Sequence, residues 1–397
     1  MDAFRRFRPI SHFIAPHSWS NDPCGALYIP ETQDYLLCYQ WNPGTTVGGN
    51  CAWGMARSKD LTIWEDCPPA LWNGTTYDRL GVFSGSIVSR VIQGQRTLFL
   101  FYTSVSALPI HWSKPYLQGC ESQSVAISTD YGRSWHRSSA NPLISAPPRE
   151  SATTGWRDPF VSQWPSMSTL LGRDHKTNYM MIASGERDVG PQLHMYVSDD
   201  MVSWDYLSAV LGAQAGSNVS SNSSFSWGVN FECASFFTLG TTDYIIVGAE
   251  ESNTSTRHNG HYLLWLSGTL VLRDGKPRFE VISHGVLDSG LLELFQLSRP
   301  IEDVGSSQQW TVDEPSGQMT TLGIRPAPQV TALRSPTFSS LETFNMIQST
   351  NFEVEAQFSN LSGNETFIFN VRASPDFKEV SRIIVDLGKK QISIDRM

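Results

Sequence analysis

Short runs in which apolar and polar residues alternate recur along the first half of the chain. Residues 51–56, 124–127 and 193–197 are three such runs, and each leads into a polar segment. Alternation with a period of two is typical of a half-buried β-strand, because successive side chains point to opposite faces. The runs show no helical periodicity, so the pattern predicts an all-β chain.

The polar segments that follow these runs form a repeat. Residues 58–64 recur in similar form at 128–135 and 198–204, and Asp60, Asp130 and Asp200 lie 70 residues apart. Aspartate favours turns because its side chain bonds the nearby backbone. A period of this length, with several strands in each unit, indicates the blades of a β-propeller. Three unrelated aspartate turns are the alternative.

Three acidic motifs each fall early in a repeat, where the first strand of a blade is expected. They are Asn21-Asp22-Pro23, Arg157-Asp158-Pro159 and Glu232-Cys233. First strands line the central channel of a propeller, so these carboxyl groups are expected to converge on the axis. Phe83-Ser84-Gly85 occupies the same place in the intervening blade, and residues 287–290 suggest a fifth start. We therefore expect five blades.

Three convergent carboxyl groups suit the cleavage of a glycosidic bond. One can act as nucleophile, one as proton donor and one as a clamp on the sugar. Metal ligation uses the same residue types, so the motifs by themselves leave both kinds of site open.

Composition narrows the possible partners. The chain has 397 residues, of which 40% are hydrophobic and 17% charged, which fits a globular protein of one large or two medium domains. Its formal net charge of −9 argues against binding to a nucleic-acid backbone or an anionic membrane. We expect a neutral small-molecule ligand, and the composition does not define an oligomeric state.

Two features of the sequence disagree about location. The basic first ten residues lack the apolar run of a signal peptide, which predicts a cytoplasmic protein for the sequence as written. A secreted or vacuolar protein with an incomplete start is the alternative, because six glycosylation sequons occur. They begin at Asn73, Asn218, Asn222, Asn253, Asn360 and Asn364.

An ordered series of motifs resembles a known family. The series runs through residues 19–23, 39–43, 53–54, 58–64, 83–85, 156–159 and 231–233. It resembles the β-fructofuranosidases of glycoside hydrolase family 32, which include invertases, inulinases and fructosyltransferases. Residues 102–112 look like the fungal branch with fructosyltransferases. A related five-bladed glycosidase for other furanosides is disfavoured by the matches at 39–40 and 83–85.

The resemblance implies a fold and a set of roles. It implies a five-bladed β-propeller catalytic domain over residues 1–300 and a β-sandwich over 301–397. Asp22 would be the nucleophile, Glu232 the general acid and base, and Asp158 the transition-state stabiliser, with Arg157 orienting Asp158 and keeping it ionised. Neither a metal nor another cofactor is implied.

The implied reaction is a retaining cleavage of terminal β-D-fructofuranosides such as sucrose or short fructans. It would pass through a covalent fructosyl-enzyme, with possible transfructosylation. Retention predicts that the carboxyl groups of Asp22 and Glu232 lie about 5–5.5 Å apart, and the role of Glu232 as an acid predicts a raised pKa.

Further side chains are candidates for contact with the sugar. Asn21, Gln40 and Ser84 suit hydrogen bonds to hydroxyl groups, although they would also suit strand capping. Trp41 and Trp19 are the candidate aromatic contacts, whereas the tryptophans of the repeat are expected to pack between blades.

The chain also departs from the family pattern. Ser20 and Cys24 replace the usual residues around the first motif, and Gly48-Gly49 replaces a Trp-Gly, so one aromatic wall is expected to be missing. Blade five is expected to be shortened after residue 290, and the sandwich is expected to be incomplete at Met397. The alternative function is therefore an inactive or unstable truncated member that at most binds fructosyl sugars.

Overall fold

The computed structural model describes most of the first 288 residues and parts of the remainder. The described stretches are 13–148, 152–220, 225–250, 261–288, 309–313, 318–321, 331–333, 355–356, 366–373 and 380–396. The chain divides into two compact units, one of residues Phe13–Ser298 and one of Met1–His12 with Arg299–Met397.

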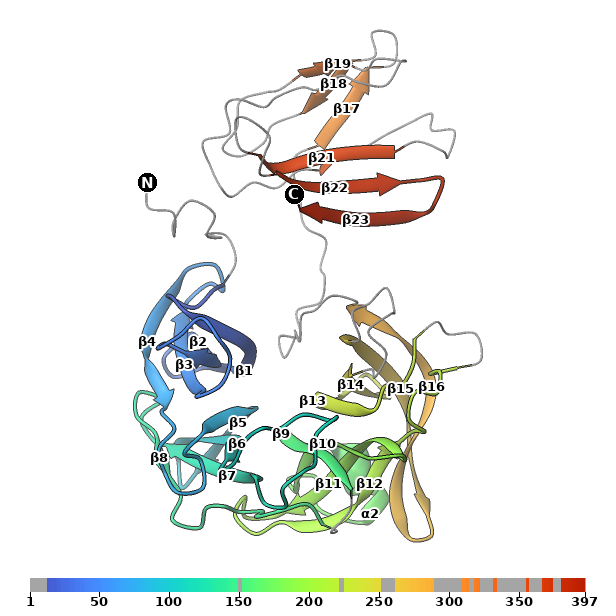
Figure 1. Cartoon of the computed structure of the whole chain (residues 1–397). Helices are drawn as coiled ribbons and strands as arrows, with labels where there is room; N and C mark the ends of the chain where they lie inside the picture. The colour runs from blue at the N-terminus through green and yellow to red at the C-terminus, as the bar shows by residue number, and fades with distance from the viewer. Residues whose placement is uncertain are drawn as a thin grey trace. The chain divides into compact units, whose positions relative to one another are not determined.

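Four antiparallel sheets of four strands make up the larger unit (Figure 1), and the strands of each sheet follow in chain order. The first sheet holds β1 (Trp19–Ile29), β2 (Asp34–Asn42), β3 (Ala52–Ser58) and β4 (Trp64–Leu71). The second holds β5 (Gly81–Ile92), β6 (Gln95–Val105), β7 (Glu121–Ser128) and β8 (His136–Arg137). The third holds β9 (Thr153–Gln163), β10 (Asn178–Glu186), β11 (Gly190–Ser198) and β12 (Asp205–Gly212). The fourth holds β13 (Asn230–Leu239), β14 (Thr242–Glu250), β15 (His261–Arg273) and β16 (Lys276–Asp288).

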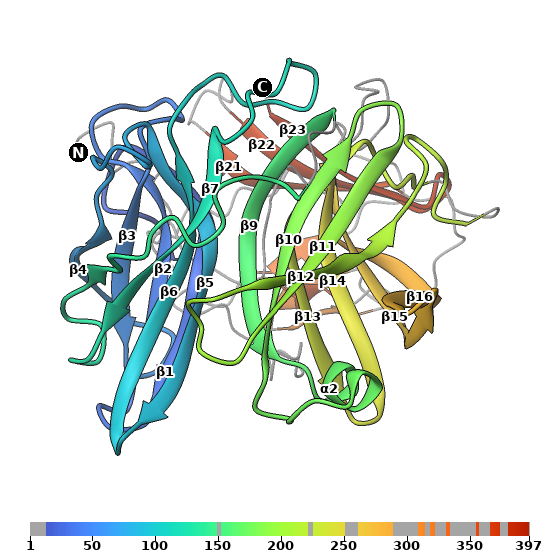
Figure 2. The same ribbon diagram turned by 90° about the horizontal axis from the view of Figure 1, so that it is seen from below.

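The first strands of the four sheets are innermost. In Figure 1 the strands β1, β5, β9 and β13 face the centre of this unit, and β1 contacts β5, β5 contacts β9, and β9 contacts β13. Figure 2 shows the strands of each sheet running side by side. These are the blades of a propeller, which confirms the predicted all-β propeller fold.

The number of blades differs from the prediction. The described residues form four blades, not five. Leu287 and Asp288, which were expected to begin a fifth blade, instead end β16, where Asp288 pairs with Leu263. The hairpin between β15 and β16 turns at Asp274 and Gly275, and its ladder continues to Asp288. The rest of the expected blade start lies outside the described residues.

The core lies between neighbouring blades. Trp53, Leu100 and Tyr102 are fully buried between blades one and two, and Phe101 and Trp156 between blades two and three. Burial of such side chains contributes about 1.5–3 kcal/mol each, so docking of the blades supplies much of the stability. Blades three and four pack on a larger cluster that includes Trp164, Phe231 and Phe236.

The predicted turn repeat is present in three blades. Asp60 Oδ1 accepts hydrogen bonds from the backbone N–H groups of Thr62 and Ile63, both at 2.8 Å. Asp200 Oδ1 accepts from the residues two and three positions on in the same way, and Asp130 Oδ1 from those three and four positions on. Each aspartate precedes a residue with a left-handed backbone, namely Leu61, Tyr131 and Met201, with φ of 63°, 64° and 64°. The side chain thus supports a turn for which glycine would otherwise be favoured.

Each innermost strand contains a β-bulge at the position expected to face the site. The register of β1 shifts between Asn21 and Pro23, and that of β5 between Phe83 and Gly85. The register of β9 shifts between Arg157 and Phe160, and that of β13 between Glu232 and Ser235. A bulge breaks the two-residue alternation and redirects one side chain. Four equivalent bulges therefore aim Asp22, Ser84, Asp158 and the Glu232 region toward the axis.

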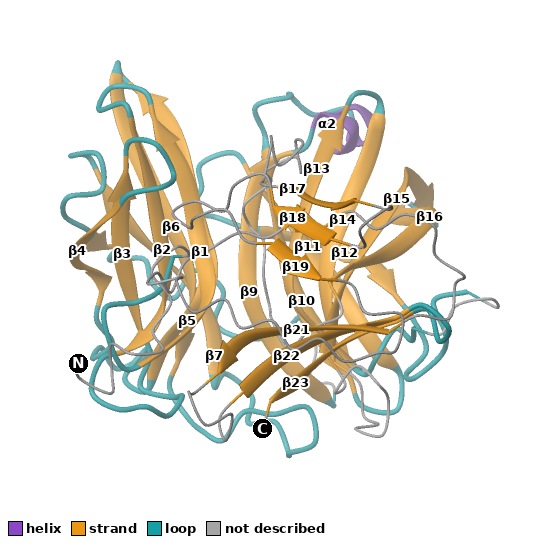
Figure 3. Ribbon diagram, turned by 90° about the horizontal axis from the view of Figure 1, so that it is seen from above, coloured by secondary structure: helices purple, strands orange, loops and turns teal. Residues whose placement is uncertain are grey.

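The smaller unit is also made of strands. One sheet holds β17 (Gln309–Asp313), β18 (Gln318–Thr321), β19 (Thr331–Leu333) and β20 (Glu355–Ala356), and the other holds β21 (Thr366–Ala373), β22 (Val380–Asp386) and β23 (Gln391–Arg396). Three segments resemble the first strands of the family's sandwich, namely 322–326, 352–356 and 392–396. Residues 322–326 and 352–354 lie outside the described residues, whereas 355–356 form β20 and 392–396 lie in β23. Figure 3 shows strands throughout and the short helix α2 (Pro165–Leu171). No helix in the described stretches is long and apolar enough to cross a membrane.

Candidate active site

Asp22 and Ser84 meet across the first two blades. Ser84 Oγ on β5 donates a hydrogen bond of 2.5 Å to Asp22 Oδ2 on β1. The other oxygen, Asp22 Oδ1, has no hydrogen-bond partner among the described residues. One oxygen of this carboxyl group is thus anchored by the protein, and the other keeps its lone pairs unused.

Asp158 joins the same group through Cys233. The backbone N–H of Cys233 donates a hydrogen bond of 3.0 Å to Asp158 Oδ2. The Cys233 thiol lies 3.7 Å from Asp158 Oδ2 and 3.7 Å from Asp22 Oδ2, although Asp22 and Cys233 are 211 positions apart in sequence. The residue after Glu232 therefore contacts both aspartates, and three blades bring their acidic motifs together.

Burial strongly perturbs Asp158. It lies on the β9 bulge with a φ of 64°, and its side chain is almost fully buried. Burial, with smaller contributions from the charges of Glu232 and Asp22, raises the pKa of Asp158 to about 7 against the opposing effect of Arg157. The Arg157 charge acts in the expected direction, since it lowers the pKa of Asp158, but loss of hydration has the larger effect. That Arg157 keeps Asp158 ionised stays a prediction.

Arg157 binds a different set of carboxyl groups from the one expected. Its Nε donates to Glu232 Oε1 at 3.1 Å, and its Nη2 also reaches that oxygen. Nη2 further donates to Glu250 Oε2 at 3.2 Å, and Nη1 to Glu121 Oε1 at 3.5 Å. Burial alone would lower the pKa of Arg157, but the charges of Glu232, Glu121 and Glu250 raise it well above its ordinary value. Arg157 thus orients Glu232, whereas Asp158 is held by backbone N–H and, through its own N–H, by Thr103.

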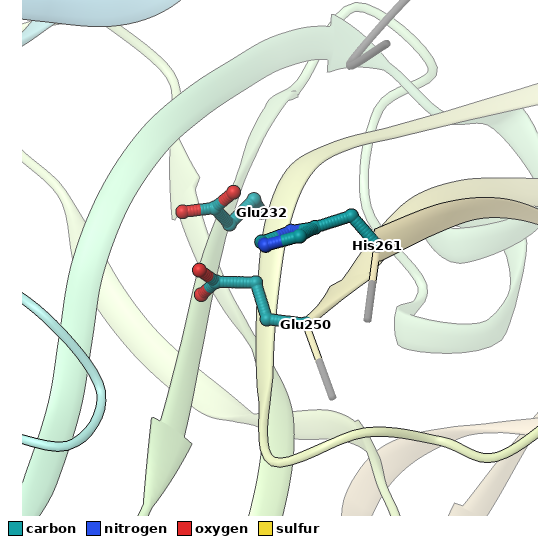
Figure 4. Close-up of side chains that lie close together, drawn as sticks. All are labelled: Glu232, Glu250 and His261. Carbon is teal, nitrogen blue, oxygen red and sulfur yellow. The ribbon is translucent and has the colours of Figure 1, made fainter. Parts of the chain in front are cut away.

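Glu250 and His261 lie beside Glu232 (Figure 4). Asn230, Glu250 and His261 are cross-strand partners on β13, β14 and β15. Ligand atoms of Glu232, Glu250 and His261 all lie within 4.8 Å of one another, a spacing that a divalent cation could bridge. Arg157 already donates to both carboxyl groups, however, and its positive charge opposes a metal ion there. We therefore assign these residues to an ion-pair network and not to a metal centre.

The other residues predicted to contact the sugar differ in where they lie relative to Asp22. Gln40 on β2 pairs with Asn21, is 2% exposed, and has a buried Nε2 without a hydrogen-bond partner among the described residues. Trp41 Nε1 donates to the carbonyl of His17 at 2.9 Å, and its ring packs near Tyr39. Gln40 and Asn21 thus lie next to Asp22 on the paired strands, whereas the indole N–H of Trp41 is bonded to a backbone carbonyl.

Trp19 lies beside the glycines at which one aromatic wall is expected to be missing. A Cβ on Gly48 would lie 3.2 Å from its indole. That the wall is missing stays a prediction.

Sequence reasoning missed Glu121 and Glu250. Glu121 is fully buried at the start of β7, where Oε2 accepts the N–H of Trp156 at 2.6 Å. Glu250 ends the apolar strand β14 opposite Asn230. The sequence signal for Glu250 was an acidic residue at the end of an otherwise apolar strand. Its role could not be predicted from this signal, because the role depends on which strand the residue faces.

The fold and the site together define a class of protein. Acidic side chains that separate blades of a propeller direct toward one another suit the cleavage of a glycosidic bond by carboxyl groups. Residues 12–275 match the family described as Glycosyl hydrolases family 32 N-terminal domain. The chain belongs to glycoside hydrolase family 32, as its motifs predicted.

Individual relatives agree with this assignment. The chain is 30% identical over 281 residues to a probable sucrose-6-phosphate hydrolase of Psychromonas ingrahamii, covering 68% of this chain and 45% of that protein. It is 34% identical over 221 residues to the extracellular exo-inulinase of Aspergillus niger, covering 51% and 38%. A β-fructofuranosidase structure from Aspergillus kawachii, complexed with glycerol, superposes with a TM-score of 0.64 at 30% identity, over 72% of this chain and 48% of that one. The chain thus spans less than half the length of these relatives.

Proposed function

We propose that this protein is a retaining glycoside hydrolase that cleaves terminal β-D-fructofuranosides such as sucrose. The observation that carries the proposal is the convergence of Asp22 and Asp158 on Cys233, next to a Glu232 that Arg157 orients. The names of the relatives in family 32 support a fructoside as substrate. Hydroxyl-binding side chains, such as Gln40 and Asn21, lie on the adjoining strands.

In the first step, Asp22 acts as the nucleophile. Its carboxylate, which Ser84 holds through Oδ2, attacks the anomeric carbon of the fructosyl unit. The glycosidic C–O bond breaks, and Glu232 transfers its proton to the departing oxygen. Ser84 holds Oδ2 and so fixes the direction in which Oδ1 points. The products of this step are the free leaving sugar and a fructosyl ester of Asp22.

In the second step, the ester is cleaved. Glu232, now ionised, takes a proton from water, whose oxygen attacks the same carbon and releases Asp22. A sugar hydroxyl in place of water gives transfructosylation. Asp158 binds ring hydroxyls of the fructose and stabilises positive charge on the ring in both transition states. This role requires the ionised form of Asp158, which burial disfavours by raising its pKa to about 7.

Two variants test the roles. Asp22→Asn keeps the hydrogen bond from Ser84 but removes the nucleophile, so turnover of sucrose should fall by at least about 10⁴-fold while the fold persists. Glu232→Gln should slow sucrose more than an aryl fructoside, whose leaving group needs no proton. Free glucose, free fructose and oligosaccharides are quantified by chromatography, with circular dichroism as the check on folding.

Each outcome has a distinct meaning. Equal glucose and fructose indicate hydrolysis, whereas excess glucose with trisaccharide indicates transfer. Retained activity in Asp22→Asn would refute the nucleophile assignment, and equal losses on both substrates would refute the acid role of Glu232. A folded wild-type protein without turnover would refute the proposal in favour of an inactive member of the family.

A further inference from the structure

The environment of Glu232 conflicts with its proposed role as an acid. A general acid must carry a proton before the glycosidic bond breaks. Glu232 Oε1 nevertheless accepts hydrogen bonds from two nitrogens of Arg157. A guanidinium group that donates to a carboxyl oxygen favours its ionised form. Some other group must therefore oppose Arg157.

Glu250 is placed to do this. Its Oε2 accepts hydrogen bonds from Arg157 Nη2 at 3.2 Å and from Asn230 Nδ2 at 2.7 Å, and its side chain is buried. Nη2 of Arg157 therefore serves both glutamates, which face each other within 4.8 Å (Figure 4). Two carboxylates this close in a buried site repel each other strongly and rarely ionise together.

The surrounding charges do not remove this repulsion. Arg157 is shared with a third carboxyl group, that of Glu121, on its Nη1 side. The other titratable groups facing the pair are His261 on β15, Asp158 on β9 and His111 in the loop between β6 and β7. The pKa of His111 is lowered, mainly by burial and by Arg157, which keeps this imidazole neutral. Arg157 is the only permanent cation in contact with three carboxyl groups of the described site.

We propose that Glu250 is a positioning residue for the proposed reaction, which shares one proton with Glu232 and so keeps the general acid protonated. The pair then carries one negative charge, which Arg157 balances. When Glu232 gives its proton to the leaving oxygen, the pair becomes doubly charged until water returns a proton in the second step. Burial, together with the charge of Glu232 and a hydrogen bond with it, raises the pKa of Glu250, as a shared proton requires. This inference rests on the proposed function.

The kinetic test is the pH profile of kcat/KM for sucrose. Glu250→Gln keeps the size and the hydrogen-bonding oxygen but removes the repelling charge, so the alkaline limb should move to lower pH by about one unit or more. On an aryl fructoside the same variant should show little shift. Glu250→Asp, which restores a carboxyl group, should bring the limb back toward the wild-type position.

Glu121→Gln is the matched control. Glu121 is buried and contacts the same guanidinium, but on the side away from Glu232. The Glu121→Gln variant should shift the alkaline limb of the kcat/KM profile clearly less than Glu250→Gln does. An equal shift in both variants, or no shift in Glu250→Gln, would overturn the proposal.

An infrared titration separates this inference from the proposed function. Near pH 7.5, about three units above the ordinary pKa of glutamate, wild type should retain a protonated carboxyl group that both Glu250→Gln and Glu232→Gln lack. This result would support the shared proton even if wild type failed to convert sucrose. Loss of the signal in only one of the two variants would overturn it.

Discussion

Arg157 offers the sharpest test of how the site is held together. Replacing it with methionine keeps most of the side-chain volume but leaves Glu121, Glu232 and Glu250 without their shared cation. All three carboxyl groups are largely buried, with side-chain exposures of 0%, 13% and 7%. Breaking a buried ion pair by removing one partner typically costs about 3–5 kcal/mol, because the remaining charge stays desolvated.

The expected loss is large enough to measure directly. For a unit of this size, about 3–5 kcal/mol corresponds to a fall in Tm of roughly 10 °C. Urea unfolding followed by tryptophan fluorescence gives the free energy of unfolding of wild type and Arg157→Met near pH 7 and near pH 5. The difference between the two proteins should shrink at the lower pH, because carboxyl groups that take up a proton no longer need a counter-charge.

Arg157→Lys serves as the control for charge against geometry. Lysine keeps the positive charge but cannot donate along three directions fixed by a planar group. It should recover part of the stability and little of the activity. An Arg157→Met variant that loses the same free energy at both pH values, or that is as stable as wild type, would refute the account of Arg157 as the shared cation.

Three further predictions concern other parts of the propeller. Asp158 binds its proton more tightly in the folded than in the unfolded protein, so its contribution to stability is lost as pH rises from about 4 to about 7. Thermal unfolding should show that the stability of Asp158→Asn declines less over this range than that of wild type. An equal decline in both proteins would contradict the raised pKa of Asp158. A Cβ on Gly85 would lie 2.0 Å from the carbonyl oxygen of Phe101. Gly85→Ala should therefore lower the free energy of unfolding by at least about 1–3 kcal/mol and disturb Ser84. A Gly85→Ala variant with the same urea midpoint as wild type would count against this. Asp200→Ala removes the acceptor for two backbone N–H groups. It should lower the free energy of unfolding by about 1–2 kcal/mol and leave kcat unchanged. A fall in kcat alongside the loss of stability would show that the turn influences the site.

The blades and the convergence of the acids could be predicted because both depend on local signals. An alternating strand followed by an aspartate turn forms through neighbouring residues, and the phase of the repeat places Asp22 and Asp158 on first strands. The Asp-Pro pairs were a further local signal. Proline cannot donate to a strand ladder, and the bulges of β1 and β9 occur at these pairs.

The partners of Arg157 could not be predicted in this way. Glu250 reaches it through the register of a hairpin, and Glu121 reaches it from another blade. The fifth-blade prediction failed for a related reason. Leu287 and Asp288 resemble a blade start, but the ladder that begins at the turn between β15 and β16 extends through them. Register over a long hairpin is a property of the assembled sheet.

The placement of one acidic motif on each of three innermost strands has a consequence for folding. Asp22, Asp158 and Glu232 belong to three different blades, and each blade holds its own strands together by internal hydrogen bonds. A partly folded molecule can therefore keep nearly all of its secondary structure and still have no assembled site. Catalytic turnover, where it occurs, reports on the mutual docking of the sheets and should disappear before far-ultraviolet circular dichroism changes.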